Sequence, residues 1–114
     1  MKIAYGTYAT PMLSLEESLV MMANMGYEGV ELAIGPKHAM PENLSSSQRQ
    51  QLKKVLAELK LDVPGFLMLG SALVGDKDAH NKRLGLTRQV IQLAKDLDIK
   101  RTPVISTGSG GGSD

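Results

Sequence analysis

The chain has 114 residues, no cysteine, and thirteen Lys and Arg against twelve Asp and Glu. The near-zero net charge argues against a nucleic-acid-binding protein, and the lack of cysteine excludes disulfides, a thiolate nucleophile and a cysteine zinc site. No apolar run reaches the roughly twenty residues that cross a membrane, and the first twenty residues lack a signal-peptide pattern. We therefore expect one cytoplasmic domain with a modest core.

The first predicted elements are a strand and a helix. Residues 2–9 begin with an apolar stretch typical of a strand and end in small residues. Ser14 and Glu17 have the spacing of a capping box, in which each side chain binds a free backbone N–H of the other residue. Gly26 suits the end of this helix because glycine readily adopts positive φ.

A second strand and a second helix follow. Residues 29–34 predict a strand, which ends at Gly35 and Pro36. Ser45 and Gln48 repeat the capping-box spacing. The apolar stripe of the helix that they begin consists of Leu52, Val55, Leu56 and Leu59.

The last predicted elements are a strand, a helix and another strand. Residues 62–69 read as the third strand, residues 79–97 as the third helix, and residues 102–107 as the fourth strand. The remaining residues, 108–114, are rich in Gly and Ser and read as a flexible tail or loop.

This strict alternation of strand and helix predicts a parallel α/β sheet. The loops after the strands (8–13, 35–44 and 70–78) are longer than those before them, as in a (β/α)8 barrel, whose active site lies in these loops. A whole barrel needs about 250 residues. We therefore predict the first half of a (β/α)8 TIM barrel over residues 1–107, with a small flavodoxin-like sheet as the alternative.

Several segments resemble the sugar phosphate isomerase/epimerase family of xylose-isomerase-like barrels. Residues 26–32, Gly-Tyr-Glu-Gly-Val-Glu-Leu, look like its second-strand signature, and residues 1–8 are similar to its first strand. Residues 78–97 resemble its third helix. Asp98 departs from the pattern, which usually has Gly there, and the fourth strand lacks the His of the endonuclease-like branch.

The resemblance implies a metal-dependent enzyme that moves a proton beside a carbonyl through an enediolate. A divalent metal (Mn, Mg, Co or Zn) polarises the carbonyl, and two carboxylates remove and return the proton. The resemblance places the metal ligands, two Glu, one Asp and one His, on strands five to eight. It therefore assigns no catalytic residue and no metal ligand to this chain, and we expect the chain alone to bind no metal and to be inactive.

Three residues are candidates for binding a sugar or sugar phosphate. Glu31 is the carboxylate of the matched second-strand signature, and it would accept hydrogen bonds from substrate hydroxyls. Tyr8, at the end of the first strand, would form a wall of the site. His38 lies in the loop after the second strand, beside Lys37. The alternatives are a structural carboxylate for Glu31, a packing role for Tyr8 and a solvated loop residue for His38.

Two other functions remain open at this stage. A half-barrel leaves unpaired strand edges, so the chain may be read as a self-associating scaffold or binding module that forms a homo-oligomer. A flavodoxin-like nucleotide-binding domain would need a phosphate loop after the first strand, where Gly6 is the only glycine. In each reading we expect neither nucleic acid nor membrane as a partner.

Overall fold

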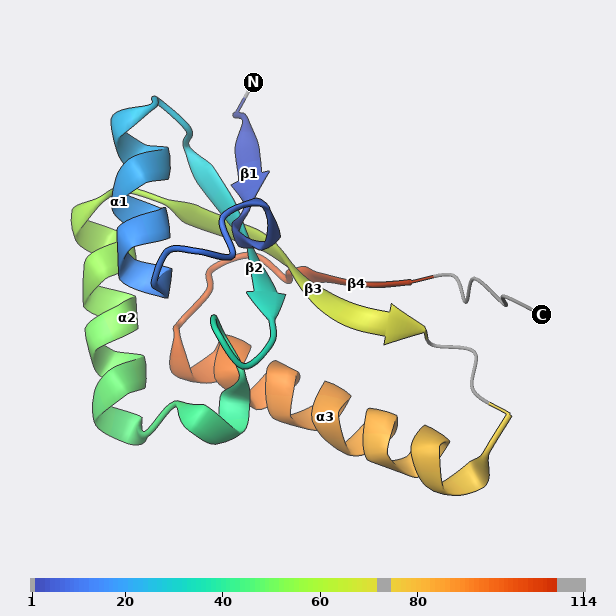
Figure 1. Cartoon of the computed structure of the whole chain (residues 1–114). Coiled ribbons are helices and arrows are strands. Elements are labelled where there is room, and N and C mark those ends of the chain that lie inside the picture. Colours follow the sequence, from blue (N-terminus) through green and yellow to red (C-terminus); the bar gives the residue numbers. More distant parts are fainter. Residues whose placement is uncertain (1, 72–74, 109–114) are drawn as a thin grey trace.

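The computed structural model describes residues 2–71 and 75–108. Four strands alternate with three helices along the chain (Figure 1). The elements are β1 (Ala4–Gly6), α1 (Leu15–Asn24), β2 (Gly29–Ile34), α2 (Ser46–Glu58), β3 (Asp62–Ser71), α3 (Lys77–Asp96) and β4 (Val104–Gly108), with short 3-10 helices η1 (Thr7–Ala9) and η2 (Pro41–Asn43). The expected Gly/Ser tail lies outside the described residues except for Gly108, which ends β4.

The helices begin where the capping boxes predict. In both α1 and α2, the serine side chain accepts a hydrogen bond from the backbone N–H three residues later, and the Glu17 or Gln48 side chain returns the bond. The start of α3 was placed too late at residue 79. Asp76 caps it by accepting from the backbone N–H of Ala79 at 2.8 Å, so the helix starts at Lys77.

Each helix ends at a residue with positive φ. Gly26 has a φ of 91°, whereas Lys60 and Asp98 adopt 55° and 53° with ordinary side chains. In all three cases the next N–H bonds back to a carbonyl in the last helical turn, which is the Schellman arrangement. Asp98 therefore takes a backbone conformation that glycine adopts more readily.

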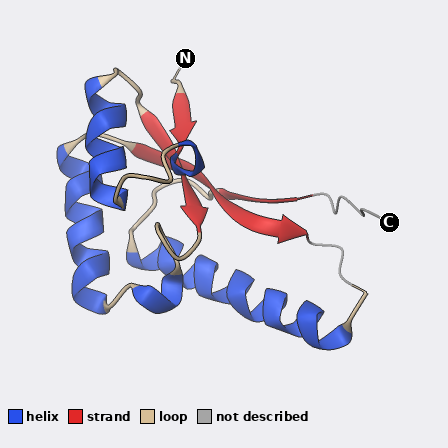
Figure 2. Cartoon of the chain, in the orientation of Figure 1, coloured by secondary structure: helices blue, strands red, loops and turns tan. Residues whose placement is uncertain are grey.

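The sheet is parallel, with the strands in the order β1-β2-β3-β4. A flavodoxin-like sheet has the order 2-1-3-4-5, so the flavodoxin-like alternative does not describe this sheet. When each strand lies beside the next one along the chain and all the crossovers have the same hand, all the helices lie on one face of the sheet. Figure 2 shows the three helices on the same side of the sheet. The described chain is thus an α/β half-barrel, as expected.

The core lies between the helices and this one face of the sheet. Its fully buried centre is formed by Leu19 and Met22 of α1, Leu32 of β2, Phe66 of β3 and Leu93 of α3. Burying apolar side chains of this size contributes about 1.5–3 kcal/mol each, so this layer holds the helices on the sheet. The opposite face carries none of the three α-helices that the structure describes.

The ends of three strands differ from the prediction. β1 is only three residues long, because residues 7–9 turn into η1. β3 runs to Ser71, two residues further than expected. β4 begins at Val104 and runs to Gly108, two residues later and one residue further than expected. The first difference matters for the site, since η1 carries Tyr8 back over the strand that precedes it.

Candidate functional site

The helix-free face of the sheet carries a row of residues in register across all four strands. Gly6 pairs with Glu31, Glu31 with Gly65, and Gly65 with Val104. Residues alternate between the two faces of a strand, and the neighbours of Glu31 in β2 (Val30 and Leu32) point into the core. Glu31 therefore lies on the opposite face, which is the inner face of a barrel.

The Glu31 carboxylate lies between two glycines. Its Oε1 is 3.7 Å from the position that a Cβ would take on Gly6, and its Oε2 is 3.6 Å from the corresponding position on Gly65. These are ordinary van der Waals distances, so the carboxylate lies directly beside the backbone of both neighbouring strands. The side chain is half-buried, and no residue within 2–71 or 75–108 forms a hydrogen bond or an ion pair with it. Its acceptor oxygens are available to a ligand.

Tyr8 lies directly over Gly6. Its ring carbons Cδ1 and Cε1 are both 2.7 Å from the position of a Cβ on Gly6, so the ring rests on the backbone of β1. The ring is 57% exposed. Gly6 is thus the point at which the Tyr8 ring and the Glu31 carboxylate approach each other, and the structure brings these two predicted residues together.

The position of Tyr8 depends on the residue before it. Thr7 is fully buried, and its Oγ1 accepts a 2.9 Å hydrogen bond from the backbone N–H of Ala33 in β2. The Thr10 hydroxyl donates to the Thr7 carbonyl at 3.0 Å and lies 2.8 Å from the hydroxyl of Ser18 in α1. The loop after β1 is therefore tied both to β2 and to α1.

His38 occupies the loop after β2, at the same end of the sheet. Its backbone N–H donates to the Gly35 carbonyl at 3.0 Å, and the following N–H, of Ala39, donates to the Ala33 carbonyl at 3.1 Å. The side chain is half-buried rather than solvated, and its Nε2 is a buried atom with no hydrogen-bond partner among the described residues. A buried imidazole nitrogen without a partner is unfavourable. No hydrogen bond in the described ranges joins His38 to Glu31 or Tyr8.

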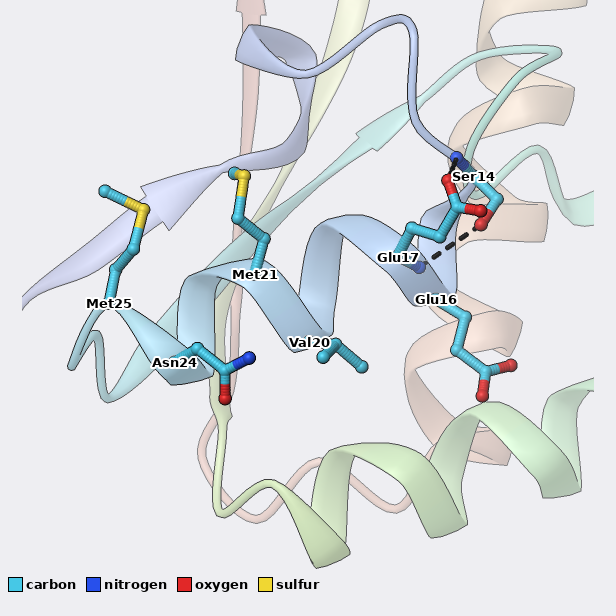
Figure 3. Close-up of a pocket in the computed structure, with 7 residues that line it drawn as sticks. All are labelled: Ser14, Glu16, Glu17, Val20, Met21, Asn24 and Met25. Carbon is cyan, nitrogen blue, oxygen red and sulfur yellow. Dashed lines mark hydrogen bonds between the residues drawn. The ribbon is translucent and has the colours of Figure 1, made fainter.

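A surface depression lies elsewhere, along the exposed side of α1. Figure 3 shows Met21 and Met25 on one side of the helix and Val20, Asn24 and Glu16 on the other. The two hydrogen bonds drawn there, between Ser14 and Glu17, form the cap of the helix. One helix lines the whole depression, with no polar groups converging on a point, so it lacks the character of a binding site.

Metal ligands do not gather in the described part of the chain. No group of three or more His, Asp and Glu in residues 2–71 and 75–108 is placed to hold a metal ion. Glu31 and His38 supply two ligand types, short of the three or four that a protein metal site uses. None of the described helices is long and apolar enough to cross a membrane.

Comparison with known proteins adds no relative: no family model matches the sequence, and no curated protein matches it. The likeness to the isomerase/epimerase family therefore rests on the residues quoted above. The half-barrel fold is compatible with that likeness but is shared by barrels of many activities.

Sequence reasoning missed the residues that shape the site. Gly6 and Gly65 flank the Glu31 carboxylate, Gly6 also leaves space for the Tyr8 ring, and Thr7 fixes the loop that carries Tyr8. The one sequence signal was the pair of hydroxyl residues after the first strand, Thr7 and Thr10. Their spacing of three residues is that of a local turn, in which Thr10 caps the Thr7 carbonyl.

Proposed function

We propose that this chain supplies one side of the substrate site of a sugar or sugar phosphate isomerase/epimerase. The observation that carries the proposal is the Glu31 carboxylate, half-buried between Gly6 and Gly65, with both oxygens free of protein partners in the described residues. In parallel α/β folds, ligands bind at the carboxyl ends of the strands, and Tyr8 and His38 lie in the two loops there.

The three side chains suit a polyhydroxylated ligand. An ionised carboxylate only accepts hydrogen bonds, so Glu31 pairs with the hydroxyl groups of a sugar. The exposed Tyr8 ring offers an apolar surface to the C–H groups of the same ligand, with a phenolic hydroxyl at its rim. In His38 the Nε2 is buried, so Nδ1 is the ring nitrogen that would donate to or accept from a ligand.

The reaction needs a set of groups that residues 2–71 and 75–108 do not bring together. Moving a proton beside a carbonyl through an enediolate takes a base, an acid and a stabiliser of the oxyanion. The implied divalent metal would polarise the carbonyl, but the described residues do not fit it. We therefore assign substrate binding to this chain, assign catalysis and metal binding to strands that it does not contain, and place the intact enzyme in the cytoplasm.

Sugar binding tests this proposal. In ligand-observed NMR, D-fructose and D-fructose 6-phosphate should show saturation transfer from the 114-residue chain. Glu31→Gln should weaken binding about tenfold, since a hydrogen bond to a charged group contributes about 1.5–3 kcal/mol. Glu28→Gln, an exposed carboxylate just before the same strand, should leave binding unchanged. Absence of transfer from the wild-type chain, or equal binding by Glu31→Gln, contradicts the proposal.

Metal binding gives an independent check. We expect Mn²⁺, titrated calorimetrically into the chain, to bind no more tightly than to exposed carboxylates. Tight one-to-one binding would place a metal site in this chain and overturn the assignment of the ligands to other strands.

The open sides of the sheet support a second candidate, a self-associating half-barrel. Neither β1 nor β4 has a second strand neighbour among the described residues. Apolar side chains on these two strands are exposed, Tyr5 to 40% and Val104 to 65%. Two copies that pair β4 with β1 at both junctions would close an eight-stranded parallel ring.

Light scattering distinguishes this candidate. A particle of about twice the 12.2 kDa chain mass, stable on dilution, supports closure by a second copy. A monomer across the micromolar range contradicts closure by a second copy and leaves the sugar-site proposal to its own test.

A further inference from the structure

The loop between β2 and α2 is held at both of its ends. At the β2 end, the N–H groups of His38 and Ala39 bond to carbonyls of residues 35 and 33. At the α2 end, the side chain of a single residue, Arg49, bonds to two carbonyls of the loop. A loop fixed at both ends presents its side chains in one arrangement, and His38 belongs to the first of these anchors.

Arg49 uses its three nitrogens in three directions. Its Nε donates to the Leu44 carbonyl at 3.0 Å, one Nη donates to the Pro41 carbonyl at 2.8 Å, and the other pairs with the Asp96 carboxylate at 2.6 Å. Only 16% of the side chain is exposed. The rigid planar fork of guanidinium makes this possible, whereas the single ammonium of lysine cannot reach the same set of acceptors.

Asp96 fixes the orientation of the fork from α3. Its carboxylate also accepts a 2.9 Å hydrogen bond from the Gln92 side chain, one helical turn earlier. These bonds from Gln92 and Arg49 hold the pKa of Asp96 below its ordinary value, so the carboxylate stays charged at neutral pH. The η2 turn of the loop also packs against α3. Arg49 thus links the loop to a helix that begins more than thirty residues later in the chain.

We infer that Arg49 is a positioning residue that holds the β2–α2 loop, and with it the His38 imidazole, at the carboxyl end of β2. Without the clamp, nothing else among the described residues bonds the Pro41 carbonyl except the N–H of Leu44 within the same turn. The inference rests on the proposed function for the use of His38 toward a ligand. The clamp itself is a statement about the free protein and can be tested without a sugar.

The decisive variant is Arg49→Lys, which keeps the charge beside Asp96 but loses the fork. We expect amide hydrogen exchange at His38 and Ala39 to become about tenfold faster. The lost hydrogen bonds of the charged guanidinium lower the free energy of local opening of the loop, and exchange occurs from the open state. The NMR signals of the His38 ring should shift and broaden at the same time. The Phe66 amide, in the core strand β3, should exchange at its wild-type rate.

Two further variants separate positioning from general stability. Arg49→Ala should loosen the same loop amides at least as much as Arg49→Lys. Arg88→Lys, on an exposed arginine of α3, should change neither the exchange rates nor the His38 signals. An equal rise in the exchange rates of His38, Ala39 and Phe66 would show that Arg49 only stabilises the whole fold. Exchange of the loop amides at the wild-type rate in Arg49→Lys would refute the clamp.

These outcomes are distinct from those of the sugar-binding test. If the loop of Arg49→Lys exchanges at the wild-type rate while the wild-type chain binds sugar at Glu31, only the role of Arg49 is refuted. A clamp that behaves as expected in a chain that binds no sugar would leave Arg49 as the anchor of the loop and refute the proposed function.

Discussion

The hydroxyl oxygen of Thr7 accepts a 2.9 Å hydrogen bond from the backbone N–H of Ala33, and both residues are buried. β1 ends at Gly6, so this side chain supplies the acceptor that a continuing strand would have offered to β2. The carbonyl of the same Ala33 accepts from Ala39 in the next loop. One residue of β2 therefore anchors both loops that carry candidate site residues.

Removing the Thr7 hydroxyl should destabilise the fold. Thr7→Val keeps the shape but leaves the buried N–H of Ala33 without an acceptor, at a cost of about 1–3 kcal/mol in the free energy of unfolding. Urea denaturation measures this loss. Thr102→Val, at an exposed position, is the matched control and should change stability by less than about 0.5 kcal/mol. Equal effects of the two substitutions would contradict the role given to the hydroxyl.

The same substitution at two glycines should have opposite effects. A Cβ on Gly65 would lie 2.9 Å from the Val104 carbonyl oxygen, so Gly65→Ala must push β3 and β4 apart, which costs about 1–3 kcal/mol. A Cβ on Gly85, inside α3, would have no atom within 4 Å apart from its chain neighbours and the backbone of its own helix. Gly85→Ala should therefore stabilise the protein by about 0.5–1 kcal/mol. Thermal denaturation of the two variants tests both signs.

The positive φ of Asp98 predicts a stabilising substitution. An ordinary side chain is strained at a φ of 53°, so Asp98→Gly should raise the free energy of unfolding by about 0.5–1 kcal/mol. Within a helix the same substituent is unfavourable, so Glu58→Gly, in the last turn of α2, should lower the free energy of unfolding by up to about 1 kcal/mol. If Asp98→Gly is instead less stable than the wild type, the ion pair of Asp98 with Lys53, 3.8 Å away, contributes more to stability than the backbone strain costs.

Acid should weaken the fold partly through Asp96. Its pKa is lowered in the folded protein by hydrogen bonds from Gln92 and Arg49, so its contribution is present above its unfolded pKa of about 3.9. That contribution is lost as the pH falls through the lower, folded pKa. Asp96→Asn should therefore be less stable than the wild type at pH 7, and the difference should shrink toward pH 2. Parallel stability curves for the two proteins over this range would contradict the assignment.

Local features of the sequence predicted local structure well. Ser14 with Glu17 and Ser45 with Gln48 bond within one turn, so their spacing alone was enough to place the starts of α1 and α2. The parallel order of the strands also followed from the alternation of elements. In the capping boxes the interacting residues are close neighbours in the chain, and in the sheet each strand pairs with the next strand along the chain.

The shape of the site depended on contacts between distant residues. From the pairing of Gly29 with Asp62, a regular register would set Pro64 opposite Glu31, but an irregularity in β3 sets Gly65 there. A strand pattern cannot reveal such a one-residue shift. Arg49 and Asp96 are likewise 47 residues apart, and the burial of the His38 ring depends on the fold around its loop.

The most direct test of the account is to locate sugar binding on the chain by NMR. In a ¹H–¹⁵N titration with D-fructose, the account predicts shifts of the amides of Gly6, Tyr8, Glu31 and Gly65, with the signals of α1 and α2 unmoved. The same titration of Glu31→Gln should show these shifts only at about tenfold higher sugar concentration. Shifts confined to the helices, or none along the row through Glu31, would contradict a ligand site on the helix-free face of the sheet.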